Sequence, residues 1–129
     1  MPRCCMRVYI PLDRRALEAL ARSGAVPPGR GYAVTAALAT VSGTDDDELL
    51  EYAALTLAAS SSRALPIVVV AADVTSVQSE DAASPGEVVV GDPVPLSAVA
   101  SFHVGDDPAE LAWYATQELD EVLAVTSSG

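Results

Sequence analysis

Short apolar runs, each ending at proline, glycine or a polar turn residue, alternate with longer segments along the chain, and they predict a sheet. One short strand is expected at residues 32–35, with a continuation toward Val41. Residues 66–74 form a nearly continuous apolar stretch, which indicates a strand buried on both faces in a parallel or mixed sheet. The remaining predicted strands cover residues 6–11, 87–90 and 99–104.

Two segments show the apolar spacing and end signals of helices. The first begins after Asp13, a residue type that caps helix N-termini, and ends at Gly24. The second opens with the polar and acidic residues 44–48 and continues over residues 49–63, with apolar side chains on almost every side. A helix of that kind either sits centrally in the domain or meets another subunit.

A third helix is expected near the C-terminal end, and it carries the single tryptophan. Asp107, Pro108 and Glu110 match the start of a helix that runs to about residue 123. At about 100° per residue, Trp113 and Gln117 lie opposite the apolar stripe of that helix. Trp113 is then either covered by a loop of its own domain or exposed as an interaction anchor. We therefore take Trp113 and Gln117 as the candidate interaction residues.

Together, these patterns predict one α/β (or α+β) domain over residues 6–124, with a mixed sheet of about five strands and three main helices. Residues 125–129 are expected to fray. Met6 is an alternative start, which would make residues 1–5 an extension of the native chain. Cys4 and Cys5 are adjacent and have no further cysteine beside them, so we expect neither a disulfide nor a zinc site.

Charge narrows the classes of partner. The 129-residue chain has a net charge of −11, which repels phosphate backbones and anionic lipid, so we expect neither a nucleic-acid nor a membrane partner. The acidity serves solubility, although a cationic partner or a divalent metal would also suit it. The apolar runs are too short for a membrane span or a signal peptide, which predicts a cytoplasmic protein.

Motifs of catalysis are sparse. The glycines form no phosphate-binding loop, and no serine-hydrolase elbow is present. His103, at the end of a predicted strand and beside Asp106, has the position of a general base, although a structural histidine is the commoner outcome. Asp73, Asp106 and Glu118 are the carboxylates that could hold a hard cation, although the abundance of acidic residues makes such a set unremarkable in itself. We therefore expect no cofactor and no metal.

Several segments occur in an order that is similar to a family of small actinobacterial proteins of unknown function. They are Met-Arg-Val-Tyr-Ile-Pro at residues 6–11, Ala-Val-Thr at 33–35, Glu-Tyr-Ala-Ala-Leu at 51–55, Val-Val-Ala-Ala-Asp-Val at 69–74, Phe-His-Val at 102–104 and Trp-Tyr-Ala-Thr-Gln-Glu-Leu at 113–119. The chain departs from the family pattern at Ala36, where a proline is expected, and at Gly105. The resemblance implies a bacterial source, the cytoplasm and a start at Met6, and it implies no activity or catalytic residue.

Two hypotheses of function follow. The first is a non-enzymatic interaction or regulatory module that self-associates, through the apolar second helix or through Trp113, with a second copy or another protein as partner. The second is a small metal-assisted or nucleotide-handling enzyme that uses Asp73, His103 and Asp106. The second hypothesis requires these three side chains to converge in one pocket.

Overall fold

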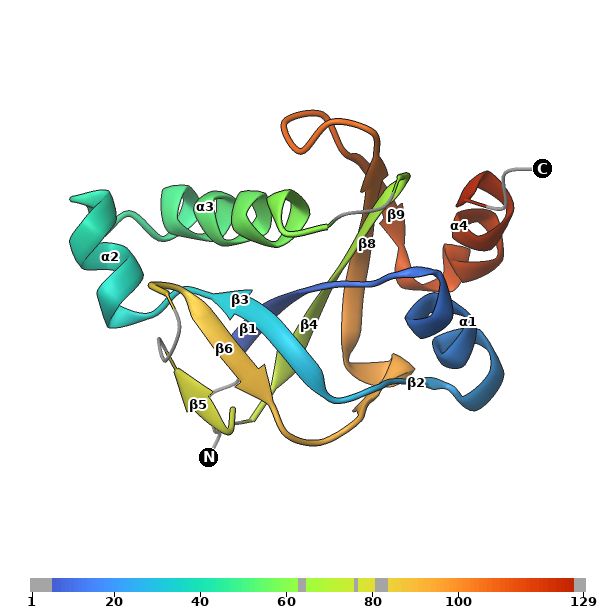
Figure 1. Cartoon of the computed structure of the whole chain (residues 1–129). Coiled ribbons are helices and arrows are strands. Elements are labelled where there is room, and N and C mark those ends of the chain that lie inside the picture. The colour runs from blue at the N-terminus through green and yellow to red at the C-terminus, as the bar shows by residue number, and fades with distance from the viewer. Residues whose placement is uncertain (1–5, 63–64, 76, 81–83, 127–129) are drawn as a thin grey trace.

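A computed structural model of the chain describes residues 6–62, 65–75, 77–80 and 84–126, and these residues form a seven-stranded sheet, a two-stranded ribbon and four α-helices (Figure 1). The strands are β1 (Met6–Pro11), β2 (Ala25–Val26), β3 (Gly29–Ala33), β4 (Ile67–Val74), β5 (Ser79–Glu80), β6 (Glu87–Val90), β7 (Val94–Pro95), β8 (Val99–Gly105) and β9 (Ala112–Ala115). The helices are α1 (Arg14–Ser23), α2 (Ala36–Ser42), α3 (Asp47–Ser60) and α4 (Leu119–Thr126), with single 3₁₀ turns η1 (Leu96–Ala98) and η2 (Thr116–Glu118).

The large sheet has the strand order β5-β6-β3-β1-β4-β8-β9, and all its pairings are antiparallel. The predicted combination of helices and one main sheet is therefore confirmed, and the predicted numbers of about five strands and three helices are approximate. The prediction of a mixed sheet is wrong, because the sheet is antiparallel throughout. The misleading feature was the apolar run in β4. Val68 and Val70 face one side and Val69 and Ala71 face the other, and both sides are buried. Helices cover both faces at β4, so an antiparallel strand acquires the unbroken apolar pattern of a parallel one.

One face of the sheet is covered by α1 and α4, and the opposite face by α3 (Figure 1). Phe102 of β8 is fully buried on the first face, where the side chains of Leu17, Leu20 and Val122 come from the two helices. On the second face, α3 packs four buried side chains against the sheet, namely Leu50, Ala54, Ala58 and Ala59. The sheet residues beneath them are Tyr9, Tyr32, Ile67, Val69 and Ala71.

The first two predicted helix starts are confirmed. The Asp13 carboxylate accepts a hydrogen bond from the Ala16 N–H at 2.8 Å, and α1 ends at Gly24, whose φ of 79° suits glycine. Asp46 caps α3 in the same way, accepting from the Leu49 N–H at 3.1 Å. The predicted continuation of the second strand toward Val41 is wrong, because α2 occupies those residues.

The third predicted helix is wrong over its first half. Asp107 caps a turn rather than a helix, since its carboxylate accepts from the Ala109 N–H at 2.9 Å and its carbonyl accepts from the Glu110 N–H at 2.9 Å. The chain then enters β9, which pairs with β8, and helical structure begins only at η2. Aspartate and proline favour turns as well as helix starts, and the aromatic pair Trp113–Tyr114 favours a strand, so pairing with β8 decides the outcome.

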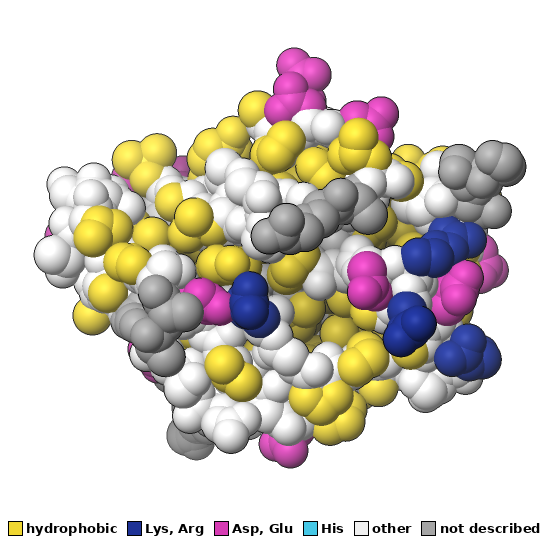
Figure 2. Space-filling view, viewed as in Figure 1, with side chains coloured by type: hydrophobic (Ala, Val, Ile, Leu, Met, Phe, Trp, Pro, Cys, Tyr) yellow, Lys and Arg dark blue, Asp and Glu magenta, His cyan; other side chains and the backbone are white. Residues whose placement is uncertain are grey.

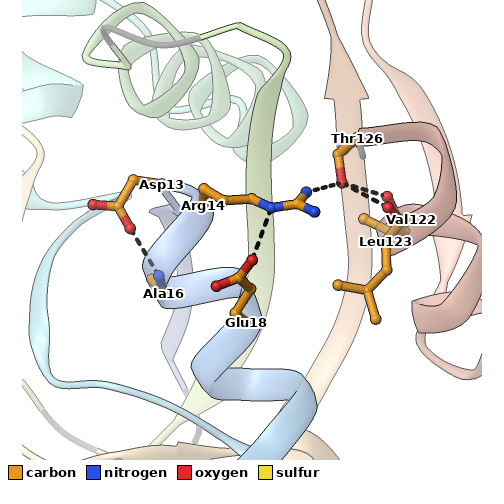
Figure 3. Close-up of polar contacts among 7 residues, drawn as sticks. All are labelled: Asp13, Arg14, Ala16, Glu18, Val122, Leu123 and Thr126. Carbon is orange, nitrogen blue, oxygen red and sulfur yellow. Dashed lines mark hydrogen bonds and ion pairs between the residues drawn. The ribbon is translucent and has the colours of Figure 1, made fainter. Parts of the chain in front are cut away.

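At the C-terminal end, α4 continues to Thr126, so residues 125 and 126, which the sequence placed in a frayed tail, are helical. Thr126 is buried, and its hydroxyl donates to the Val122 carbonyl at 2.7 Å. The same hydroxyl accepts from Arg14 Nη1 at 3.2 Å, while Arg14 Nε contacts Glu18 Oε2 at 3.1 Å (Figure 3). These contacts join α1 to α4 on one face of the sheet. Cys4, Cys5 and residues 127–129 lie outside the described residues.

Among the described helices, none has the length and apolar character needed to cross a membrane.

Candidate functional site

The face of the sheet that carries α3 extends beyond that helix. α3 packs across β3, β1 and β4, whereas the same face continues over β8 and β9. We call this continuation the His103 face and define it by Ser101 and His103 of β8 and Trp113 and Ala115 of β9. The Trp113 side chain lies directly opposite His103 and is 62 % exposed. The structure therefore brings together the histidine and the tryptophan that the sequence singled out separately.

His103 is held by its neighbour on the strand. The Ser101 hydroxyl lies 3.0 Å from His103 Nε2, and Ser101 is buried. The two residues are two positions apart, so both side chains lie on the same face of β8. Burial lowers the pKa of His103, and the positive charge of Arg7 lowers it further. The imidazole is therefore neutral at pH 7 and can exchange a hydrogen bond with Ser101 in either tautomer.

An ion pair lies farther along the same face, on β1 and β4. Arg7 Nε donates to Asp73 Oδ1 at 2.6 Å and Arg7 Nη2 donates to Asp73 Oδ2 at 3.2 Å, from opposite positions of the two strands. The hydrogen bond to Asp73 raises the pKa of Arg7. Burial raises the pKa of the neighbouring Tyr9, and the carboxylate of Glu51 on α3 adds to that rise. Tyr9 is thus a neutral phenol at pH 7 beside the Arg7–Asp73 ion pair.

The three side chains of the enzyme hypothesis do not converge. His103 lies opposite Val69 of β4, and Asp73 follows four residues later, roughly 13 Å away along the strand. Asp106 is exposed and follows Gly105, which pairs with Ile67 at the other end of β4. Among the described residues, no three histidine, cysteine, aspartate or glutamate side chains are grouped so that they could hold a metal ion.

Two other candidate residues lie just after β9. Glu118, a candidate cation ligand, directs its Oε1 to the Ala115 N–H at 2.8 Å and closes the turn of η2. Gln117 is exposed in η2, outside the strand that carries Trp113. The expectation that Gln117 and Trp113 share one face of a helix is therefore wrong, because a strand and a 3₁₀ turn replace the helix there.

Arg7, Tyr9 and Ser101 were missed by the reasoning from sequence. Their signal is the alternation of polar side chains at every second position, Arg7 with Tyr9 and Ser101 with His103. Such spacing places each pair on one face of a strand. The relation between the two pairs depends on the pairing of β1 and β8 with β4, which the sequence does not state.

The backbone N–H and C=O groups of Trp113 also lie at the open edge of the sheet. β9 lies at the end of the strand order, and the Ala115 N–H donates to Glu118, so this donor points away from β8. In an antiparallel strand the N–H and C=O of one residue point to the same side, and the side alternates from residue to residue. The backbone groups of Trp113, two residues earlier, therefore also point away from β8. Trp113 presents its indole and its backbone together at the edge.

The depressed pKa of His103 predicts a pH dependence of stability. Between the folded pKa and the unfolded value of about 6.5, the unfolded chain binds more protons, so the free energy of unfolding falls as the pH falls. The contribution is fully present above about pH 6.5 and is lost as the pH falls through the folded pKa. We expect urea unfolding midpoints between about pH 8 and 5 to fall less for His103→Gln than for the wild type. An equal fall of the urea midpoint with pH in the wild type and in His103→Gln would contradict the burial of a neutral imidazole.

Comparison with known proteins gives a family and no activity. Neither a curated protein nor a solved structure matches the chain. A model of a family described as a family of unknown function (DUF6912) matches residues 6–110, which include Arg7, Tyr9, Asp73, Ser101 and His103. This match covers most of the chain, and the protein belongs to that family of unknown function.

Proposed function

We propose that this protein is a non-enzymatic cytoplasmic interaction module that self-associates, with two copies pairing antiparallel through β9. One observation carries the proposal: Trp113 exposes 62 % of its surface and directs its backbone N–H and C=O toward the open edge of the sheet. An exposed tryptophan is a common anchor of interfaces, and an unpaired strand edge is a template for a further strand. Both features occur here at the same residue.

The pairing follows from twofold symmetry. A dimer of identical copies uses the same patch on both partners, so β9 pairs with β9 of the second copy. With Trp113 at the twofold axis, its N–H and C=O bond to the C=O and N–H of the same residue in the second copy. The two indoles then lie side by side on the face that carries His103. The Ala115 N–H is already bonded to Glu118, so Trp113 supplies the central hydrogen bonds.

The energies favour a weak and reversible dimer. Two hydrogen bonds contribute about 1 kcal/mol each, and two partly buried indoles add several kcal/mol through roughly 25 cal/mol per Å² of apolar surface. Lost translational and rotational freedom opposes association by about 4–15 kcal/mol. The favourable terms exceed this cost only at its lower end, so we expect a Kd of about 100 μM or weaker. The net charge of −11 on each copy opposes association, so added salt is expected to tighten it.

Sedimentation equilibrium over about 5–500 μM protein tests the proposal. The weight-average mass is expected to rise from 13.2 kDa toward twice that value, and to rise at lower protein concentration when salt is added. A mass that stays at 13.2 kDa at every protein and salt concentration would remove self-association from the account.

A further inference from the structure

A cavity of about 370 Å³ lies on a different part of the molecule from β9. It opens to solvent and is lined by the end of β1, the start of α1, the segment from β2 into β3, and the residues just after α3. Figure 2 shows this hollow near the centre of the view, with hydrophobic side chains in its floor and side chains of both charge signs at its rim. The volume falls within the range of small-molecule sites, about 300–1,000 Å³.

One wall of the cavity carries a carboxylate. Asp13 accepts from the Ala16 N–H through Oδ1 at 2.8 Å, and its other oxygen points away from α1 (Figure 3). The neighbouring Arg14 does not neutralise this oxygen, because its guanidinium is directed to Glu18 and to Thr126 of α4 (Figure 3). Asp13 is therefore a negative group that can accept a further hydrogen bond at the rim.

Another wall carries a guanidinium. Arg30 of β3 lines the cavity and uses its Nε to contact Glu87 Oε2 at 2.7 Å. Its side chain is 64 % exposed, and the two terminal nitrogens hold further N–H donors in a planar fork that suits a carboxylate. Among the described residues of the lining, the two formally charged side chains are Asp13 and Arg30, which are opposite in sign and come from different segments of the chain.

The remaining lining supports a ligand with an apolar middle and a positive end. Pro11, Ala16 and Pro27 supply accessible apolar surface at the cavity. Ser61 also lines the cavity, at the C-terminal end of α3, where the helix dipole is negative. The Ser61 hydroxyl donates to the Ala58 carbonyl at 2.7 Å, so toward the cavity its oxygen acts as an acceptor. Acceptors therefore come from Asp13 and Ser61, and donors from Arg30.

We propose that this cavity binds a small zwitterion whose ammonium and carboxylate are separated by an apolar segment, such as an aliphatic dipeptide. The ammonium is held by the Asp13 carboxylate with the Ser61 hydroxyl, and the carboxylate is held by Arg30. The apolar segment lies on Pro11 and Pro27. An anion alone would gain nothing from the Asp13 carboxylate, and a cation alone would gain nothing from the N–H groups of Arg30 that Glu87 leaves available, so a net-neutral ligand with separated charges suits both.

Calorimetric titration with L-alanyl-L-leucine tests this site on the wild type and on two variants. Asp13→Asn keeps a good cap for α1 while removing the charge. Arg30→Gln removes the guanidinium, and its amide can still donate a hydrogen bond to the largely buried Glu87 carboxylate. Each variant is expected to bind the dipeptide at least about tenfold more weakly than the wild type. The wild type is expected to bind the N-acetylated or C-amidated dipeptide more weakly by the same factor. Arg22→Gln, an exposed change at the other end of α1, is the matched control and is expected to leave the affinity unchanged.

Two results would overturn the proposal. One is the absence of saturable binding to the folded wild type up to about 10 mM dipeptide. The other is an affinity that neither the two charge variants nor the two blocked dipeptides change. Because the cavity and β9 are separate, either result leaves the proposed self-association untouched.

Discussion

Replacing Phe102 by alanine is expected to lower the free energy of unfolding by about 3–5 kcal/mol. Phe102 is 0 % exposed and is the largest of the fully buried side chains in the described part of the chain. It packs in the core between the sheet and the helices α1 and α4, and its removal leaves a cavity that neighbouring side chains fill only in part. Equilibrium unfolding in urea measures the loss.

Phe102→Leu is the matched control for that change. Leucine keeps most of the apolar volume, so we expect it to cost less than about half as much as alanine. Phe102 also lies directly behind the His103 face, because its neighbours on β8, Ser101 and His103, face the opposite side of the sheet. A loss below about 1.5 kcal/mol for Phe102→Ala would contradict the assignment of this side chain to the centre of the core.

Trp113→Ala is expected to weaken self-association about thirtyfold or more while leaving the fold intact. A central interface tryptophan typically contributes 2 kcal/mol or more when truncated, that is, about thirtyfold in Kd. The side chain is 62 % exposed in the single chain, so its removal costs the isolated domain little. Sedimentation equilibrium gives the dissociation constant, and thermal unfolding of dilute protein reports the intact fold.

Tyr52→Ala is the matched control for Trp113→Ala. Tyr52 is an aromatic residue of α3 with a similar exposure of 55 %, and it lies away from β9. We expect the Kd to be unchanged by this substitution. If Tyr52→Ala weakened association and Trp113→Ala did not, the interface would be the apolar outer side of α3, which the sequence offered as the alternative.

Local signals in the sequence predicted the elements that local interactions decide. Asp13 and Gly24 mark both ends of α1 correctly, because capping involves only neighbouring residues. The strands β4, β6 and β8 were recognisable from their β-branched side chains. The prediction failed where pairing with a strand from another part of the chain decides the local structure. Asp107 and Pro108 fit a helix start, but pairing with β8 makes residues 112–115 a strand.

The candidate site shows the same division. His103 and Trp113 stood out in the sequence as the single histidine and the single tryptophan, but their meeting on opposite positions of β8 and β9 depends on the register. Arg7 and Asp73 are 66 residues apart along the chain, and only the pairing of β1 with β4 joins them. Cavity walls are still harder to foresee, since Asp13, Arg30 and Ser61 come from three separate segments.

Amide hydrogen exchange at Trp113, followed by NMR at low and high protein concentration, tests the central claim most directly. In the single chain the Trp113 N–H points to solvent at the edge of the sheet and should exchange rapidly. Pairing of two β9 strands gives it a hydrogen bond, so its exchange is expected to slow as the concentration rises. The Ala115 N–H, which already donates to Glu118, serves as the internal reference and should change little. Rapid exchange of Trp113 that does not depend on concentration, in samples whose mass shows association, would place the interface elsewhere and contradict the account.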